Sequence, residues 1–219
     1  MERVLEPELM DEAEQALAYA AADFAEPHER CVTVCEEFVG RDGLAGTILD
    51  LGCGPADVTV RLARRFPRAT FHGVDGAEAM LAHGRARVER EGLGDRIRLA
   101  RAVLPRDAPP LARYDGVVSN SLLHHLHDPS VLWAAVTRYA KAGAPVFVMD
   151  LRRPASMEDA RRLAQAYARS EPEVLRRDFF NSLCAAFTPD EVREQLRRAG
   201  LALDVLAVGD RHLVAHGYR

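Results

Sequence analysis

Residues Thr47–Gly54 read Thr-Ile-Leu-Asp-Leu-Gly-Cys-Gly and determine the fold class that we expect for this chain. The apolar run Ile48–Leu51 has the length and composition of a buried strand. A turn rich in glycine and proline ends it, and an amphipathic stretch with helical spacing follows. Because glycine can adopt positive φ and lets a ligand approach the backbone, this strand, turn and helix predict a ligand-binding turn.

Two acidic residues lie where predicted strands end. Asp50 is at the end of the first strand, at the edge where open α/β sheets bind ligands, and a carboxylate there suits a cationic group. Asp75 ends a second predicted strand, Phe71–Asp75, 21 positions after Gly54. A carboxylate at that place can accept hydrogen bonds from both ribose hydroxyls of a nucleoside.

Three motifs occur in order along the chain: Asp50-x-Gly52-x-Gly54, Gly73-Val74-Asp75 and Tyr114-Asp115-Gly116-Val117-Val118-Ser119-Asn120. Together they resemble the first, second and fourth motifs of the class I S-adenosylmethionine-dependent methyltransferases, across residues 46–150. The resemblance implies an α/β fold of Rossmann-like type, with a seven-stranded, mostly parallel sheet, an antiparallel last strand and helices on both faces. It also implies S-adenosyl-L-methionine as cofactor and in-line methyl transfer as the reaction.

The resemblance also implies roles for individual residues. Asp50 and the backbone of Gly52–Gly54 would hold the amino-acid end of the cofactor, Asp75 the ribose, and Asn120 the methionine moiety and methyl group. Met80 would lie against the adenine, with plain core packing as the alternative. The predicted cofactor-binding set is Tyr19, Asp50, Gly52, Cys53, Gly54, Asp75, Gly76, Met80, Ala102, Val103 and Asn120.

The predicted third strand, residues 96–102, departs from the family pattern at its end. Many members carry an acid there that bonds the adenine amino group, whereas this chain has Arg101-Ala102-Val103-Leu104-Pro105. We therefore expect the backbone of Ala102 or Val103 to contact the adenine. Asp107 is expected to lie too far along the chain.

Histidines follow the fourth predicted strand, whose end faces the methyl group in this family. Imidazole titrates near neutrality, so His125, and His124 as second choice, are candidate general bases. The alternative is that both only orient backbone or cofactor. We expect no metal site, because His124, His125 and His127 are too close in sequence to aim at one ion, and no carboxylate or cysteine cluster is evident to complete the set.

Four parts of the chain are expected. Residues 1–45 form an N-terminal helical cap, with Pro27 separating two helices, and Tyr19 lies over the cofactor or simply packs the helix down. Residues 46–151 form the cofactor-binding core. Residues 152–187 are a helical insertion, or lid, after the fifth strand. Residues 188–219 form a helix, begun by a capping box at Thr188 and Glu191, and a hairpin that completes the sheet.

The insertion is expected to cover the ligand crevice. Its candidate substrate-binding residues are Tyr167, Arg177, Phe179 and Asn181. The alternative is an exposed helix whose aromatic residues belong to the core. At the tip of the final hairpin, Asp210, Arg211 and His212 are expected to be surface residues.

Composition narrows the class of partner. The net charge of −4 and the absence of a basic stripe argue against nucleic acid, so we expect a small-molecule substrate. Four scattered cysteines, no signal-peptide pattern and no apolar run long enough to span a membrane favour a cytoplasmic protein. The alternatives are an NAD(P)-dependent oxidoreductase, against which the missing third glycine and the hairpin argue, and a non-catalytic cofactor-fold binding module.

Overall fold

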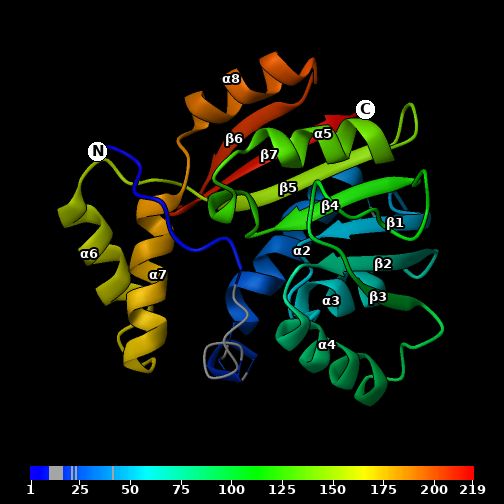
Figure 1. The fold of residues 1–219 in the computed structure, drawn as a ribbon, viewed down its shortest axis with the longest axis horizontal. Helices are drawn as coiled ribbons and strands as arrows, with labels where there is room; N and C mark the ends of the chain where they lie inside the picture. Colours follow the sequence, from blue (N-terminus) through cyan, green and yellow to red (C-terminus); the bar gives the residue numbers. More distant parts are fainter. Residues whose placement is uncertain (10–16, 21, 23, 41) are drawn as a thin grey trace.

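A twisted seven-stranded sheet forms the centre of this computed structural model, which describes residues 1–9, 17–20, 22, 24–40 and 42–219 (Figure 1). The strands lie in the order β3-β2-β1-β4-β5-β7-β6. Strand β7 runs antiparallel to both of its neighbours, and the other neighbouring pairs are parallel. The expected sheet is therefore confirmed. The strands are β1 (Gly46–Leu51), β2 (Ala69–Asp75), β3 (Ile97–Arg101), β4 (Gly116–Asn120), β5 (Pro145–Leu151), β6 (Asp204–Val208) and β7 (His212–Tyr218).

Helices cover both faces of the sheet, as expected (Figure 1). One face packs against α2 (Ala25–Val39), α3 (Asp57–Arg65) and α4 (Glu78–Arg90), and the other against α5 (Ser130–Tyr139) and α8 (Pro189–Ala199). Trp133 of α5 is fully buried, and its indole N–H donates to Gln195 of α8 over 2.9 Å. Burying apolar side chains on both faces is the main source of stability for such a layered fold.

The insertion lies apart from these layers. Helices α6 (Met157–Tyr167) and α7 (Glu173–Ala185) pack against each other beyond the carboxyl ends of β4 and β5 (Figure 1). They share a small apolar cluster with Leu151 at the end of β5. The short 3₁₀ turn η1 (Leu123–His125) follows β4 and contacts α7. The insertion thus lies at the edge of the sheet where both acidic strand ends are found.

Several local signals in the sequence act as expected. The Thr188 hydroxyl accepts from the Glu191 N–H and the Glu191 carboxylate accepts from the Thr188 N–H, so the capping box of α8 is confirmed. Helix α8 ends at Gly200, whose φ is +67°. Pro27 lies in the first turn of α2 rather than between two helices, a position where the missing N–H has no intrahelical partner to lose.

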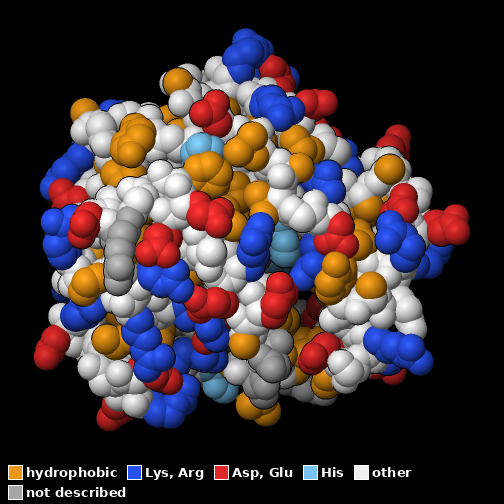
Figure 2. Space-filling model, turned by 180° about the vertical axis from the view of Figure 1, so that it is seen from behind, with side chains coloured by type: hydrophobic (Ala, Val, Ile, Leu, Met, Phe, Trp, Pro, Cys, Tyr) orange, Lys and Arg blue, Asp and Glu red, His pale blue; other side chains and the backbone are white. Residues whose placement is uncertain are grey.

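Charged side chains of both signs are interspersed on the face shown in Figure 2. Many are paired: Arg61 and Arg65 of α3 both contact Glu29 of α2, for example. Among the helices that the structure describes, we find none with the length and apolarity needed to cross a membrane.

Asp57, the first residue of α3, joins three helices. Its carboxylate accepts from Arg61 within α3 and lies 2.7 Å from Nδ1 of His28 on α2 and 2.5 Å from Arg87 on α4. Burial opposes the charge on Asp57, but the contacts with His28, Arg61 and Arg87 outweigh it and hold its pKa well below the usual range. The ionised carboxylate therefore stabilises the packing of α2, α3 and α4.

We expect Asp57→Asn to lower the free energy of unfolding at pH 7 by about 2 kcal/mol, the scale of hydrogen bonds to a charged group. Because the folded-state pKa of Asp57 is lowered, this stabilisation is complete above the unfolded-state pKa of about 4 and is lost as the pH falls further. Urea unfolding of both proteins from pH 7 to pH 3 should therefore show a difference that shrinks below pH 4. Asp95→Asn, in an exposed turn, is the control and should change little. A difference independent of pH would contradict this account.

Candidate active site

The glycine turn after β1 is fixed against β2. The N–H groups of Gly52 and Cys53 both donate to the carbonyl of Val74, over 2.9 and 3.1 Å. Gly52 has a φ of +71°, and a Cβ built on it would lie only 2.8 Å from the side chain of Leu122. A side chain at this position is therefore excluded both by backbone strain and by contact with the loop after β4.

Asp75, at the end of β2, is held by this turn. One of its carboxylate oxygens accepts from Gly54 N–H over 2.9 Å, and the other accepts from Ala77 N–H over 2.8 Å. A carboxylate oxygen can accept more than one hydrogen bond. Both oxygens are therefore held in place by backbone N–H groups.

Asp50, at the end of β1, is almost completely buried. The Thr59 hydroxyl donates to it over 2.6 Å. Burial raises the pKa of Asp50 to about 7, although the hydrogen bond from Thr59 acts in the opposite direction. A cationic ligand group beside this carboxylate would favour its ionised form.

All eleven residues predicted for the cofactor line one cleft of about 180 Å³. Residues that the sequence analysis did not select also line it, namely Leu9, His28, Asp57 and Leu122 among others. The eleven come from segments far apart in the sequence, and the parallel sheet brings them together at one edge. Their roles toward a cofactor stay predictions.

Asp107, after the end of β3, is not among the residues that line the cleft, in agreement with the expectation that it lies too far along the chain. Its carboxylate accepts from Val103 N–H over 2.9 Å. The N–H of Ala102 donates to the carbonyl of Asp75 over 2.9 Å. The backbone N–H groups of both predicted adenine contacts therefore already have partners within the protein.

A second cavity, of about 800 Å³, adjoins the cleft. Tyr19, Asn120 and His125 are among the residues that line both spaces. The four residues predicted for the substrate all line the second cavity, namely Tyr167, Arg177, Phe179 and Asn181. Their roles toward a substrate also stay predictions.

The expectation that the hairpin tip is merely surface is wrong for two of its residues. Arg211 and His212 line the second cavity. The Arg211 guanidinium lies 3.5 Å from the ring centroid of Tyr167, whose hydroxyl donates to Asp210 over 2.7 Å. The hairpin and α6 therefore meet at the cavity wall, a contact that no local sequence pattern reveals.

The two candidate histidines have different surroundings. His124 is buried, and its Nδ1 lies 2.5 Å from the carboxylate of Asp150, the next-to-last residue of β5. Burial lowers the pKa of His124, but the Asp150 carboxylate outweighs it and the net pKa is raised. Burial and the neighbouring His124 lower the pKa of His125 to about 3. His125 is thus neutral at pH 7 and His124 is the imidazole held by a carboxylate.

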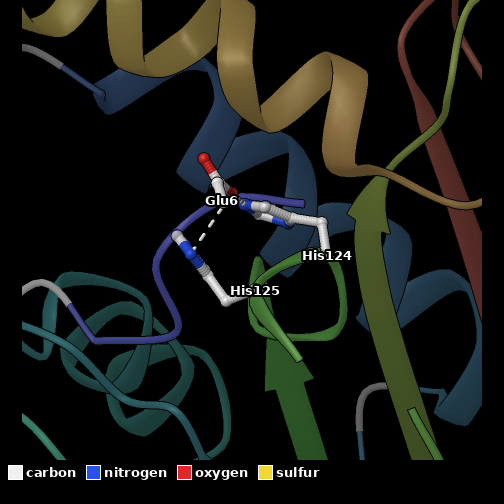
Figure 3. Close-up of side chains that lie close together, drawn as sticks. All are labelled: Glu6, His124 and His125. Carbon is white, nitrogen blue, oxygen red and sulfur yellow. Dashed lines mark ion pairs between the residues drawn. The ribbon is translucent and has the colours of Figure 1, made fainter. Parts of the chain in front are cut away.

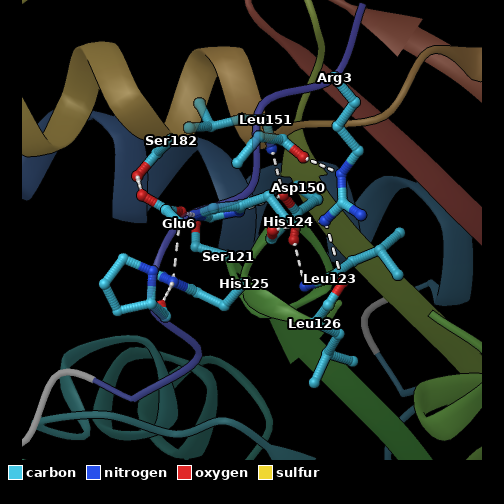
Figure 4. Close-up of polar contacts among 12 residues, drawn as sticks. Arg3, Glu6, Ser121, Leu123, His124, His125, Leu126, Asp150, Leu151 and Ser182 are labelled. Carbon is cyan, nitrogen blue, oxygen red and sulfur yellow. Dashed lines mark hydrogen bonds and ion pairs between the residues drawn. The ribbon is translucent and has the colours of Figure 1, made fainter. Parts of the chain in front are cut away.

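Glu6 is a functional candidate that the sequence analysis missed. Its Oε1 lies 3.5 Å from Nε2 of His124 and 3.3 Å from Nδ1 of His125 (Figure 3). Burial raises the pKa of Glu6, and the Ser182 hydroxyl on α7 donates to its Oε2 over 3.1 Å (Figure 4). No motif marks Glu6, because its position depends on contacts between the N-terminal segment and the rest of the fold.

Arg3 holds the N-terminal segment in place. Its guanidinium donates to the carbonyls of His124 and Leu126, each over 2.9 Å, and to that of Ala185 (Figure 4). The N–H of Val4 donates to the carbonyl of Cys184 over 3.0 Å. The segment therefore bridges the loop after β4 and the end of α7.

Comparison with known proteins relates this geometry to a family. The pattern of a methyltransferase domain family matches residues 48–144. Trans-aconitate 2-methyltransferase of Mycobacterium tuberculosis is 33% identical over 174 residues, which are 77% of this chain and 62% of that protein. The enzyme of the same name from Variovorax paradoxus is 36% identical over 131 residues, 58% of this chain and 46% of that one. The chain thus matches less than two thirds of the length of these curated relatives.

Solved structures share the fold. A SAM-dependent methyltransferase from Aquifex aeolicus superposes with a TM-score of 0.71 at 17% identity, covering 94% of this chain and 98% of that one. The plantazolicin methyltransferase BpumL in complex with SAH superposes with a TM-score of 0.70 at 12% identity, covering 93% and 89%. At sequence identities this low, the similarity shows a shared fold.

The raised pKa of Asp50 predicts a stability change in the ligand-free protein. The folded state holds the Asp50 proton more tightly than the unfolded state, so ionisation of Asp50 lowers stability as the pH rises from about 4 to about 7. We expect Asp50→Asn to raise the melting temperature at pH 8 by at least about 2 °C. A gain of about 1 kcal/mol in the free energy of unfolding raises the melting temperature of such a domain by a few degrees.

Differential scanning fluorimetry at pH 4 and pH 8 checks this. The gain should be much smaller at pH 4, where the folded state holds the proton and the unfolded state is about half protonated. Asp204→Asn, at an exposed position of β6, serves as control. A melting temperature at pH 8 that is unchanged or lower in Asp50→Asn would show that burial of this charge carries no such cost.

Proposed function

Because this chain belongs to the class I S-adenosylmethionine-dependent methyltransferase family, we propose that it transfers a methyl group from S-adenosylmethionine to a small-molecule acceptor. One observation carries the proposal: Asp50, Asp75 and the glycine turn between β1 and α3 line one cleft, which adjoins a larger cavity. When bound, S-adenosylmethionine supplies a methyl group on a sulfonium, which an acceptor atom displaces.

The residues of the cleft fit that cofactor. The open space at Gly54, where an added Cβ would meet no atom within 4 Å, the buried carboxylate of Asp50 and the fixed oxygens of Asp75 suit an amino-acid group, a positive charge and a ribose respectively. In this proposal Asp50 and Gly52–Gly54 bind the amino-acid end, and Asp75 binds the ribose. Met80, Ala102 and Val103 lie along the cleft where the adenine would sit.

The second cavity is the proposed acceptor site. Asn120 and His125 border both spaces, so an acceptor atom in the larger one can approach the methyl group from there. Alignment of the two reactants is the main contribution expected of the protein, because it removes much of the entropic barrier. His125 and His124 are the proposed catalytic residues, as the imidazoles that face the acceptor.

The charged residues that line the second cavity restrict the charge of an acceptor that could bind there. Among the described residues that line it, five are acidic and two are arginines: Glu6, Glu26, Glu171, Glu173 and Asp178 against Arg177 and Arg211. Trans-aconitate, the acceptor that the relatives are named for, carries three carboxylates. We therefore expect a neutral or cationic acceptor to bind better than trans-aconitate.

The proposal gives residues 1–45 and 152–187 the role of covers over the two spaces, which would exclude water during transfer. Tyr19 and Phe24 on one side, and Tyr167, Phe179 and Asn181 on the other, support this role by lining the second cavity. A cytoplasmic location belongs to the same proposal, supported by four free cysteines, all buried.

We expect Asp75→Asn to weaken binding of S-adenosylmethionine and S-adenosylhomocysteine by about 10- to 100-fold, since each hydrogen bond to a charged group contributes about 1.5–3 kcal/mol. Isothermal titration calorimetry measures this directly. Glu78→Gln, an exposed acid at the start of α4, is the matched control and should bind as the parent protein does.

Turnover is then tested with trans-aconitate, a neutral phenol and a primary amine, by following formation of S-adenosylhomocysteine. If the parent protein binds neither S-adenosylmethionine nor S-adenosylhomocysteine, or if Asp75→Asn binds them unchanged, the assigned cofactor site is wrong. Binding without turnover of any acceptor would favour the non-catalytic binding module.

A further inference from the structure

We propose that Glu6, His124 and His125 bind one divalent transition-metal ion beside the acceptor cavity. Within the part of the chain that the structure describes, these three residues each offer a ligand atom, and the three atoms lie within 4.8 Å of one another. All three line the second cavity. Their side chains lie close together (Figure 3). The ligand atoms are Glu6 Oε1, His124 Nε2 and His125 Nδ1.

The distances suit an ion. Glu6 Oε1 stands 3.5 Å from Nε2 of His124 and 3.3 Å from Nδ1 of His125. Ligands about 2.0–2.2 Å from a tetrahedral or octahedral ion stand roughly 3.0–3.5 Å from one another. The two imidazole rings have centroids 4.2 Å apart, so both ring nitrogens can face the carboxylate without a change of fold.

The surrounding contacts orient two of the three ligands. The Asp150 carboxylate, 2.5 Å from Nδ1 of His124, favours the tautomer with a proton on Nδ1 and leaves the lone pair of Nε2 toward Glu6. The same Asp150 accepts from Leu123 N–H over 2.7 Å, so it is itself fixed. A carboxylate behind a histidine is the usual outer contact of metal-binding imidazoles. The Ser182 hydroxyl donates to Oε2 of Glu6, the oxygen that is not a proposed ligand, and so orients the Glu6 carboxylate.

Glu6 Oε1 gives independent support. The side chain of Glu6 is 8% exposed, and Oε1 is buried without a hydrogen-bond partner among the described residues. A buried acceptor without a partner carries the full cost of its desolvation. His125 Nδ1 lies 3.4 Å from the carbonyl of Pro7 and 3.3 Å from Oε1 of Glu6, so both contacts are long. An ion between these groups would satisfy both.

The ligand types indicate the class of ion. Two imidazoles and one carboxylate suit zinc, iron, cobalt or nickel, whereas magnesium and calcium prefer oxygen ligands throughout. Three protein ligands leave at least one position open, as in sites where a metal binds a substrate oxygen. Here that position would face the second cavity, where the ion could bind an oxygen of the acceptor.

The proposal revises the expectation of no metal site. That expectation assumed that no carboxylate elsewhere in the chain would complete a ligand set, and Glu6 shows the assumption to be wrong. It was right to doubt that one segment aims three imidazoles at one point. His127 is not in the cluster, and its Nε2 lies 2.7 Å from the carbonyl of Glu6 instead.

The test is binding of Zn²⁺ to the full chain after dialysis against a chelator, measured by isothermal titration calorimetry. We expect one ion per chain, with affinity at least tenfold weaker in Glu6→Gln and in His125→Asn. Glu2→Gln, an exposed acid in the same segment, and His83→Gln on α4 are matched controls and should bind as the parent does. Co²⁺ should give an absorption spectrum of nitrogen and oxygen coordination, lost in the same two variants.

Two results would overturn the inference: no Zn²⁺ binding by the parent chain, or binding that Glu6→Gln and His125→Asn leave unchanged. Circular dichroism of each variant separates loss of a ligand from loss of the fold. The ion's contact with an acceptor rests on the proposed function, but metal binding does not. Titration of the same samples with S-adenosylhomocysteine therefore distinguishes failure of the metal site from failure of the cofactor site.

Discussion

The pairing of β1 with β2 is the constraint on which the site depends. In the parallel register, Leu51 lies opposite Val74, so both strands end at the same edge of the sheet. The hydrogen bond from Gly54 to Asp75 then joins the turn after β1 to the end of β2. Without that register, the turn and the two acids would not face one cleft. Strand pairing, rather than any single side chain, therefore creates the site.

Several carboxylates are buried at this edge of the sheet, and each has different partners to offset the cost of burying its charge. Asp50 has, among the described residues, a hydroxyl donor from Thr59, and burial raises its pKa to about 7. Asp150 has the imidazole of His124 and the N–H of Leu123. Glu6 has Ser182 at one oxygen and, within the described ranges, the imidazoles of His124 and His125 at the other. Because burying a charge is costly, incomplete compensation at Asp50 and Glu6 marks the places where a cation would stabilise the protein most.

Much of the fold could be predicted from the sequence because its signals are local. A run of apolar residues ends in a glycine turn, a capping box begins α8, and two short strands flank Gly209-Asp210. The residues of the cleft could be predicted for a similar reason, since they lie at strand ends whose order the motifs fix. The contacts of Asp57, Glu6 and Arg211 could not, because their partners lie on other elements and no spacing along the chain brings them together.

The N-terminal segment shows how a widespread fold can acquire its own chemistry. The loop after β4 supplies His124 and His125, but neighbouring backbone alone does not decide where the imidazoles point. Arg3 donates to the carbonyl of His124, and Glu6 meets both rings, so a segment outside the sheet fixes the loop and adds a third functional group. None of the seven strands includes this segment, so the groups it presents can differ while the strand order stays the same. The identity of the groups facing the second cavity is thus separable from the architecture that places the two cavities side by side.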